Sequence, residues 1–530
     1  MRTTSRLTRV LTAVAGGLTA VALAACGTSP VPEEARVHED DAALDLPVAL
    51  RPAGEGQRSV MWVGNNWDGT ASIVDARTLE VLKRGVDLIP DKAEETNRIL
   101  RDPVALVFYL AINAGPGQGH NQYVDDMFTT MDGKYLAVSR PSFADVVWID
   151  IARATAGRTD SIVREQQMDG YRTDHMQVSN DGTRLLVSDS TARQVIEYSM
   201  IDGTLDGKSV RVGDRLRTFP SGETPHESNY TEDGERILHA SIGRVYTPLD
   251  DLDPADGDLL GLPLDKLNLG GLLGGLPGLG NLGNLGNLGN LVNLLSLDKL
   301  LGTLPWSKLE AAVKADRWMQ YVDAGTFEVL QRWDLGKELA EAGHPGMSSA
   351  VRPVAVHPDG RLLYLQVSFL HGYVVFDTQA ADLNGTTDYT LGGMPEPAKG
   401  AVVDVVELEN RVPTMMREAY VNDSAHHGIA ISGDGRTLCV AGTMDDYAAL
   451  VDAETGEATY FDEETTGHGY GKPYWSTEGL DDTCWVSLSD DDAVAVLSTR
   501  TGEELAYLEV GNHPQRVRHG YVPESVVATW

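Results

Sequence analysis

A short unit recurs along this chain of 530 residues, a polar turn with the dipeptide Asp-Gly followed by a short apolar strand. Glycine accepts the positive φ of a tight turn and aspartate bonds to its own backbone, so each copy predicts a hairpin corner. Repetition of such a unit is typical of propeller blades or of a solenoid. The clearest copies are Asp132-Gly133, Asp181-Gly182, Asp233-Gly234, Asp359-Gly360 and Asp434-Gly435.

The two ends of the repeat region complement each other. Residues 60–81 look like outer strands without an inner one, and the tail at 513–522 looks like an innermost strand without outer ones. With a degenerate copy at 474–502, the count is seven. The sequence therefore predicts an all-β, seven-bladed β-propeller that is closed by exchange of N- and C-terminal strands, which removes open sheet edges. The alternative, two packed β-sandwiches, does not explain a terminal strand that completes the first unit.

These turn and strand units resemble those of the YVTN/YncE-like seven-bladed β-propellers. The resemblance covers nearly all of residues 58–524, which we take as the propeller domain. It implies the fold and leaves the function open, because propellers host many unrelated activities.

A low-complexity segment at 250–315 interrupts the fourth blade, between the expected strands at 245–247 and 318–323. Residues 267–297 carry no charge, and leucines recur at every third position from 276 to 300. Because this step winds around a helix, it builds no single apolar face. The interpretations left open are a flexible loop and an adhesive loop that contacts membrane or a partner. A transmembrane segment is disfavoured by the asparagines within it.

The N-terminus has the pattern of a secreted protein. Arg2, Arg6 and Arg9 precede an uncharged stretch that ends at Ala25, which predicts a signal peptide over residues 1–25. The sequence Leu-Ala-Ala-Cys that ends at Cys26 resembles the lipobox of bacterial lipoproteins. The resemblance implies that Cys26 becomes the lipidated new amino terminus, with residues 26–57 as anchor and linker. The alternative is an ordinary cleaved leader with an incidental cysteine.

Charge narrows the classes of partner. The chain has 43 Lys and Arg against 78 Asp and Glu, a net charge of -35, and phosphate recognition needs a basic face. We therefore expect no nucleic-acid partner. The anchor makes the membrane a partner, and it predicts a lipid-anchored protein on the extracytoplasmic face of the cell membrane.

Histidines gather where innermost strands are expected to begin, beside the mouth of the central channel. Two basic residues, Arg352 and Lys472, stand at the corresponding place in two other blades, next to Pro353 and Pro473. The candidate ligand-binding ring at the hub is His175, His226, Arg352, His427, Lys472 and His513.

Imidazoles that converge from several blades can also hold a transition metal, and nitrogen ligands suit copper. The candidate metal ligands are His120, His175, His226, His426, His427, His468 and His513. This arrangement loosely resembles the propeller of nitrous-oxide reductase, whose hub histidines hold a copper cluster. The two prolines and the two basic residues named above depart from that pattern.

Two cysteines remain after Cys26. Aligning Asp452 with Ser498 places Cys439 and Cys484 on opposite faces of neighbouring blades. The two thiols therefore either meet across the blade interface as a disulfide or face away from each other, and an extracytoplasmic location permits the disulfide.

Two functions follow from these features. The first is a cell-surface lipoprotein whose propeller binds a protein or a small ligand without catalysis. The alternative is a metal-dependent oxidoreductase, with copper or another transition metal held by the histidine ring.

Overall fold

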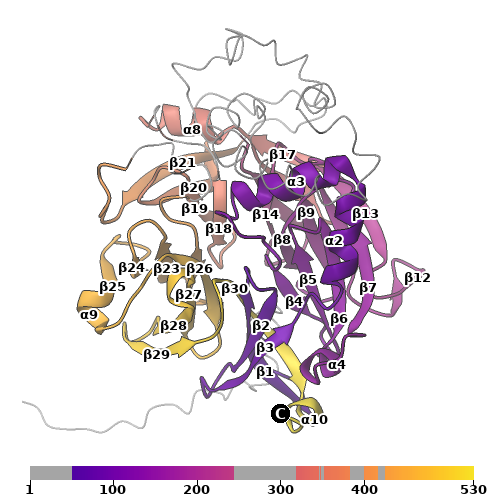
Figure 1. Cartoon of the computed structure of the whole chain (residues 1–530). Coiled ribbons are helices and arrows are strands. Elements are labelled where there is room, and N and C mark those ends of the chain that lie inside the picture. Colours follow the sequence, from indigo (N-terminus) through magenta and orange to yellow (C-terminus); the bar gives the residue numbers. More distant parts are fainter. Residues whose placement is uncertain are drawn as a thin grey trace, which may run out of the picture. The chain divides into compact units, whose positions relative to one another are not determined.

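A computed structural model of the chain describes residues 51–243, 318–344, 347, 351–381, 399–415, 420 and 424–530. All of them belong to the compact unit Leu46–Trp530. Their strands form seven four-stranded antiparallel sheets and one two-stranded ribbon (Figure 1). The predicted seven-bladed β-propeller is confirmed.

The blades are numbered in chain order. Blade 1 holds β1 (Gln57–Asn65), β2 (Thr70–Asp75), β3 (Val81–Asp87) and β30 (Pro514–Pro523). Blade 2 holds β4 (Met127–Thr129), β5 (Tyr135–Arg140), β6 (Asp145–Asp150) and β7 (Ile162–Gln167). Blade 3 holds β8 (Thr173–Val178), β9 (Arg184–Asp189), β10 (Gln194–Ser199) and β13 (Arg215–Pro220), with the ribbon β11 (Gly203–Leu205) and β12 (Lys208–Val210) between its last two strands.

The other four blades follow the same order. Blade 4 holds β14 (Pro225–Tyr230), β15 (Arg236–Ser241), β16 (Met319–Asp323) and β17 (Val329–Trp333). Blade 5 holds β18 (Val351–Val356), β19 (Leu362–Val367), β20 (Gly372–Ala381) and β21 (Lys399–Glu407). Blade 6 holds β22 (Ile429–Ile431), β23 (Thr437–Gly442), β24 (Tyr447–Asp452) and β25 (Ala458–Phe461), and blade 7 holds β26 (Pro473–Gly479), β27 (Thr483–Leu488), β28 (Ala493–Ser498) and β29 (Glu504–Glu509).

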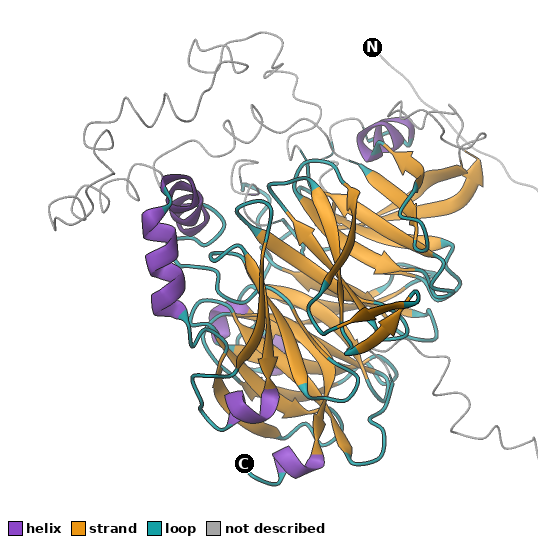
Figure 2. Ribbon diagram, turned by 90° about the vertical axis from the view of Figure 1, so that its right-hand side faces the viewer, coloured by secondary structure: helices purple, strands orange, loops and turns teal. Residues whose placement is uncertain are grey.

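The helices lie in the connections and at the C-terminal end (Figure 2). They are α2 (Lys92–Arg101), α3 (Pro103–Ala114), α4 (Ile151–Thr155), α8 (Leu335–Glu341), α9 (Glu463–Thr466), a 3₁₀ helix (Ser489–Asp491) and α10 (Glu524–Val527). None of the helices in the described ranges is long and apolar enough to span a membrane.

The Asp-Gly dipeptides form the corners between the first and second strands of blades 2 to 6, as predicted. In blade 2, Oδ1 of Asp132 accepts the Lys134 backbone N–H at 3.0 Å and the Thr130 hydroxyl at 2.6 Å. Gly133 has a φ of 65°. Aspartate and glycine thus play the separate roles that this turn requires.

The C-terminal strand closes the ring. β30 pairs antiparallel with β1, from Gln57 opposite Pro523 to Val63 opposite Val517, and it is the innermost strand of blade 1. In Figure 1, the yellow end of the chain lies beside the indigo β1. The predicted strand exchange is therefore confirmed.

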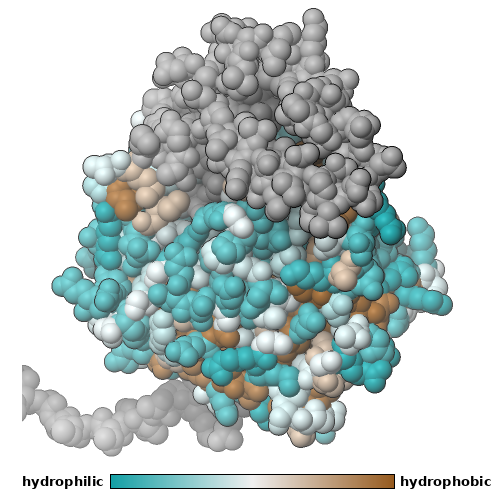
Figure 3. All heavy atoms as spheres, in the orientation of Figure 1, coloured by the Kyte–Doolittle hydropathy of each residue, from teal (hydrophilic) through white to brown (hydrophobic). Residues whose placement is uncertain are grey.

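The core consists of apolar layers between neighbouring blades. Val60 and Trp62 of β1, for example, pack in one cluster with Leu136 and Val138 of β5, and all four are at most 1% exposed. Burying one large apolar side chain contributes about 1.5 to 3 kcal/mol. On the face shown in Figure 3, described hydrophilic residues cover most of the surface.

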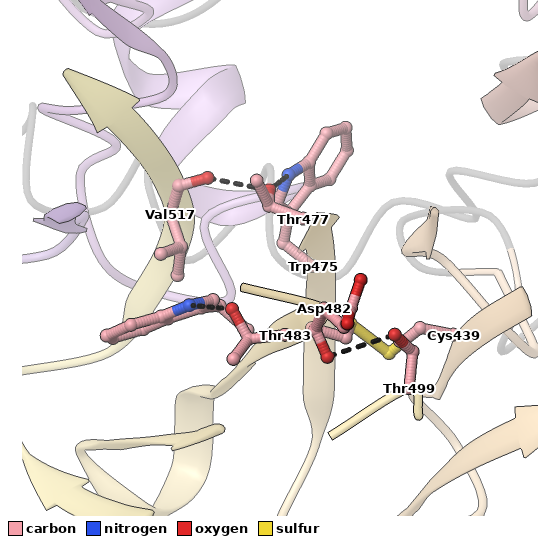
Figure 4. Close-up of a disulfide and its surroundings, with 9 residues drawn as sticks. Cys439, Trp475, Thr477, Asp482, Thr483, Thr499 and Val517 are labelled. Carbon is pink, nitrogen blue, oxygen red and sulfur yellow. Dashed lines mark hydrogen bonds between the residues drawn. A yellow bond between two sulfur atoms is a disulfide. The ribbon is translucent and has the colours of Figure 1, made fainter. Parts of the chain in front are cut away.

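A disulfide joins blades 6 and 7. Cys439 on β23 and Cys484 on β27 are bonded, with Cα atoms 6.5 Å apart, and both are 1% exposed (Figure 4). Of the two arrangements left open by the sequence, the structure has the one in which the thiols meet.

Several sequence-based predictions lie outside the described residues. They are the signal peptide, Cys26, most of the 26–57 linker, the strand expected at 245–247 and the insertion at 250–315. The strands that flank the undescribed residues 244–317 are β15 and β16 of the fourth blade.

Candidate functional site at the propeller hub

Innermost strands bring polar and aromatic side chains together at the propeller hub, at the ends where these strands begin. We define the hub cluster as His175, His226, His427, Arg516 and Trp475 with the acidic residues Asp125, Asp174 and Glu227. These residues come from blades 1, 2, 3, 4, 6 and 7. All of them are buried.

Local irregularities in the strands position several of these side chains. The pairing register shifts between Thr173 and Met176 in β8, between Pro225 and Glu227 in β14, and between Pro473 and Ser476 in β26. His175, His226 and Trp475 fall inside these three bulges. β-Bulges turn a side chain out of the regular alternation and are common beside functional sites.

Three imidazoles meet in the hub cluster. His175, His226 and His427 are 2–3% exposed, and each offers a ring nitrogen within 4.8 Å of those of the other two. Gly428 permits this approach, because a Cβ there would lie 2.3 Å from the backbone N of Ser476. His427 stacks on Tyr474, with ring centroids 4.3 Å apart.

His175 is held from both sides. Its Nε2 contacts Nη2 of Arg516, which can only donate, so the proton of the neutral ring is on Nδ1. Nδ1 donates to Oε2 of Glu227 at 2.8 Å. Burial raises the pKa of Glu227 to about 7. Both ring nitrogens of His175 are therefore engaged within the protein.

His226 and His427 differ from His175 in their partners. Their Nδ1 atoms are buried and have no hydrogen-bond partner among the described residues. Burial lowers the pKa of both rings well below the usual range, and Arg352 and Arg516 lower both further. Both imidazoles are neutral at physiological pH, and cationic side chains are close to them.

The Arg516 guanidinium lies over an aromatic ring. Its guanidinium carbon is 4.0 Å from the Trp475 ring centroid. The Trp475 Nε1–H donates to Oγ1 of Thr477 at 2.8 Å, and Thr477 donates to the Val517 carbonyl at 2.7 Å, which fixes the indole against β30 (Figure 4). Arg516 is 1% exposed, and its Nε and Nη1 have no hydrogen-bond partner in the described part of the chain.

Acidic residues lie on the His175 side of the hub cluster. Asp125 is 3.4 Å from Nη2 of Arg516, and burial raises its pKa to about 7. Asp174 is 3.6 Å from Arg172 and accepts the Ser190 hydroxyl at 2.8 Å. One side of the cluster is therefore acidic, and the side of His226 and His427 is basic.

A neighbouring arginine on β30 pairs with a carboxylate. Arg518 donates through Nε and Nη2 to the two carboxylate oxygens of Asp126, both at 2.8 Å. Asp126 also accepts the Met176 backbone N–H at 3.1 Å. The two arginines are two residues apart on the same strand. Arg516 is the one whose Nε and Nη1 lack a hydrogen-bond partner among the described residues.

The two basic residues predicted for the hub lie near it. Arg352 of β18 donates from Nε to the Ser368 hydroxyl at 3.2 Å. Its positive charge lowers the pKa of both His226 and His427. Lys472 lies just before β26, and its positive charge lowers the pKa of both His427 and His513.

Four of the seven candidate metal ligands, His120, His426, His468 and His513, lie outside the hub cluster. His120 and His513 stack on the two faces of Trp67, with centroids 3.8 and 3.7 Å from its ring. His513, which was also a candidate for the ligand-binding ring, lies immediately before β30, as expected, but its ring stacks on Trp67. His468 is 2.8 Å from Glu504 near the outer strand of blade 7.

The fourth, His426, belongs to a second buried group, which we call the paired cluster: His371, His426, Asp445, Tyr420 and Tyr447. Nδ1 of His371 donates to Oδ2 of Asp445 at 2.5 Å, and Tyr420 lies 2.9 Å from its Nε2. Nε2 of His426 is 2.9 Å from the same carboxylate oxygen and 3.0 Å from the Tyr447 hydroxyl.

Sequence reasoning missed Arg516, Trp475 and the acidic residues of the hub cluster. It searched the positions just before each inner strand, whereas the hub residues include the second or third residue of β8, β14, β26 and β30. The available signal was the polar sequence Gln515-Arg516 at the start of an innermost strand, where apolar residues are expected.

The comparisons with known proteins concern the fold and not the function. No family model matches the chain, and no curated protein does. Among solved structures, hydrazine synthase of Kuenenia stuttgartiensis is similar, with a TM-score of 0.44 and 12% identity, over 84% of this chain and 93% of that one. The selenomethionine-substituted virginiamycin B lyase of Staphylococcus aureus has a TM-score of 0.39 and 10% identity, over 72% of this chain and 83% of that one.

Proposed function

We propose that this chain is a YVTN/YncE-like lipoprotein, tethered through Cys26 to the extracytoplasmic face of the cell membrane, whose propeller binds a small ligand at its hub without catalysis. The tether rests on the sequence at Cys26 and on the uncharged stretch that precedes it. The ligand site rests on the hub cluster.

One observation carries the ligand site. His226, His427 and Arg516 are at most 3% exposed, yet each has buried polar atoms without a hydrogen-bond partner among the described residues. Leaving a buried donor or acceptor unpaired costs about 1 to 3 kcal/mol. Three such side chains from three blades, converging on one point, are explained by a ligand that supplies the missing partners.

The second candidate function is a transition-metal site, favoured by the three ring nitrogens within 4.8 Å of one another. The contact of Arg516 with Nε2 of His175 counts against it, because a metal ligand needs a free lone pair. A guanidinium at that place also repels a cation.

Thermal shift measurements on the purified protein test the ligand site. A panel of neutral sugars, amines, oxyanions and divalent metal ions is screened on the wild type, on His427→Gln and on His357→Gln. His357 sits in the Asp-Gly corner of blade 5, 24% exposed, and serves as the matched control. We expect at least one compound to raise the melting temperature of the wild type and of His357→Gln, and not that of His427→Gln. If no compound gives this pattern, the hub is not a ligand site.

The tether has its own test. Cys26→Ala, expressed with the full leader, should move the protein from the membrane fraction to the soluble fraction, because the acyl chains have no other attachment point in the proposal. Equal membrane association of both forms would contradict the anchor.

A further inference from the structure

We infer that the hub ligand is a small oxyanion, a carboxylate or a phosphate, held between Arg516 and the imidazoles of His226 and His427. This inference rests on the proposed function and names the chemistry of its ligand.

The unpaired atoms of Arg516 specify an acceptor. Nε and Nη1 carry three N–H groups between them, and a guanidinium has no acceptor atom, so the missing partner must accept hydrogen bonds. The position over the Trp475 ring and the contact with His175 hold the guanidinium in place. Planar donors in a fixed position suit carboxylate and phosphate oxygens.

The charged side chains around His226 and His427 favour an anion. The charged groups that lower the pKa of His427 are all cationic: Arg516, Arg352 and Lys472. The pKa of His226 is lowered in the same way by Arg352, Arg516 and Arg172. Asp125 and Asp174 lie instead on the His175 side, where they face Arg516 and Arg172. An anion beside His226 and His427 is therefore attracted, and a metal cation there is repelled.

His175 is a positioning residue in this arrangement. Its Nδ1 donates to Glu227 and its Nε2 accepts from Arg516, so it has no nitrogen left for the ligand. It holds one end of the guanidinium, while the neutral imidazole of His226 retains one N–H to donate and His427 is hydrogen-bonded to the backbone of Tyr474. The ligand thus receives donors from blades 1 and 4.

Isothermal titration calorimetry at neutral pH tests the chemistry. Inorganic phosphate and citrate are the oxyanion probes and separate the two sources of oxygen ligands, and zinc chloride and copper(II) chloride are the cation probes. The proteins are the wild type, Arg516→Gln, Arg516→Lys and Arg58→Gln. Arg58 pairs with Glu524 outside the hub and is the matched control.

We expect one oxyanion to bind the wild type in a 1:1 ratio. Its Kd should rise at least tenfold in Arg516→Gln, to a smaller extent in Arg516→Lys, and less than twofold in Arg58→Gln. Binding of a metal or of a neutral compound in a His427-dependent way, without oxyanion binding, overturns the inference and leaves the proposed function standing. An absence of every His427-dependent ligand overturns both.

A second measurement does not depend on variants that fold. Crystals of the wild type soaked in selenate should show an anomalous selenium peak beside Arg516, His226 and His427. Absence of that peak, together with no calorimetric binding of citrate, would overturn the inference.

Discussion

The hub cluster and the paired cluster are both buried groups of histidines, but they differ in how their polar atoms are matched. In the paired cluster, Asp445 is shared by His371 and His426 and also accepts the Arg411 backbone N–H at 2.7 Å. In the hub cluster, His226 and His427 have cations as neighbours and no acid bonded to them.

The difference teaches that buried histidines alone do not identify a site. Both clusters bring ligand atoms within 4.8 Å of one another. One atom of the paired cluster, Nδ1 of His426, lacks a partner, whereas the hub cluster lacks partners for atoms of four side chains, His226, His427, Arg516 and Asp125. A matched network is explained by the stability it provides, and an unmatched one needs another reason to persist.

The largest effect is expected where the paired cluster loses its acid. Asp445→Ala leaves the donors of His371, His426 and Arg411 without their acceptor, which should lower the free energy of unfolding by roughly 3 to 5 kcal/mol. Urea unfolding followed by circular dichroism measures this. Asp404→Ala, at an exposed position of β21, is the control and should change it by about 0.5 kcal/mol or less. A loss below about 1 kcal/mol in Asp445→Ala would show that the network is not structural.

The two clusters should also respond to pH with opposite signs. Burial raises the pKa of Asp445, but hydrogen bonds from His371 and His426 outweigh it and hold the pKa at about 2. Since the unfolded value is about 3.9, the stabilisation by Asp445 is complete above about pH 4 and is lost as the pH falls toward 2.

In the hub, Asp125 and Glu227 have folded pKa values of about 7. The native state keeps protons that the unfolded state has released, so stability falls as the pH rises from about 4 to 7, by about 1.4 kcal/mol per pH unit for each group. Asp125→Asn with Glu227→Gln should flatten that slope in urea titrations at a series of pH values. Burial also raises the pKa values of Asp145 and Glu478, to about 6 and about 8, so the wild-type slope minus the variant slope is the quantity to compare. Equal slopes would contradict the prediction.

The smallest effect on stability is expected in the hub itself. His427→Gln removes an imidazole whose Nδ1 has no hydrogen-bond partner in the described chain, and it loses the stacking on Tyr474, so the free energy of unfolding should change by about 1 kcal/mol or less. Chemical unfolding of this variant beside Asp445→Ala compares the clusters directly. A loss as large as that of Asp445→Ala would make the hub a structural cluster as well.

Much of the fold was predictable from local rules. Asp132-Gly133 and its four counterparts predict the hairpin corners, because aspartate and glycine are the residues that such turns require. The strand at 513–522 predicts ring closure, because no outer strands follow it in the sequence. The hub was harder. A shift of one residue turns a strand side chain to the opposite face, and the bulges at His175, His226 and Trp475 cause such shifts without a sequence signature. His175, His226 and His427 were predictable because histidines stand where innermost strands begin, whereas Arg516 lies within the strand whose sequence indicates ring closure.

β30 both closes the ring and supplies Arg516 and Arg518 to the hub, and this matters during synthesis of the chain. The other strands of the described propeller precede it in the chain, so they leave the ribosome earlier, and until β30 docks on β1 the ring is open and the hub has neither Arg516 nor Arg518. A chain cut short before residue 514 therefore has an unclosed propeller with an exposed β1 edge, and it lacks both hub arginines. Partial products of synthesis or proteolysis thus lose ring closure and the hub arginines together, and their unpaired strand edge is open to pairing with other chains.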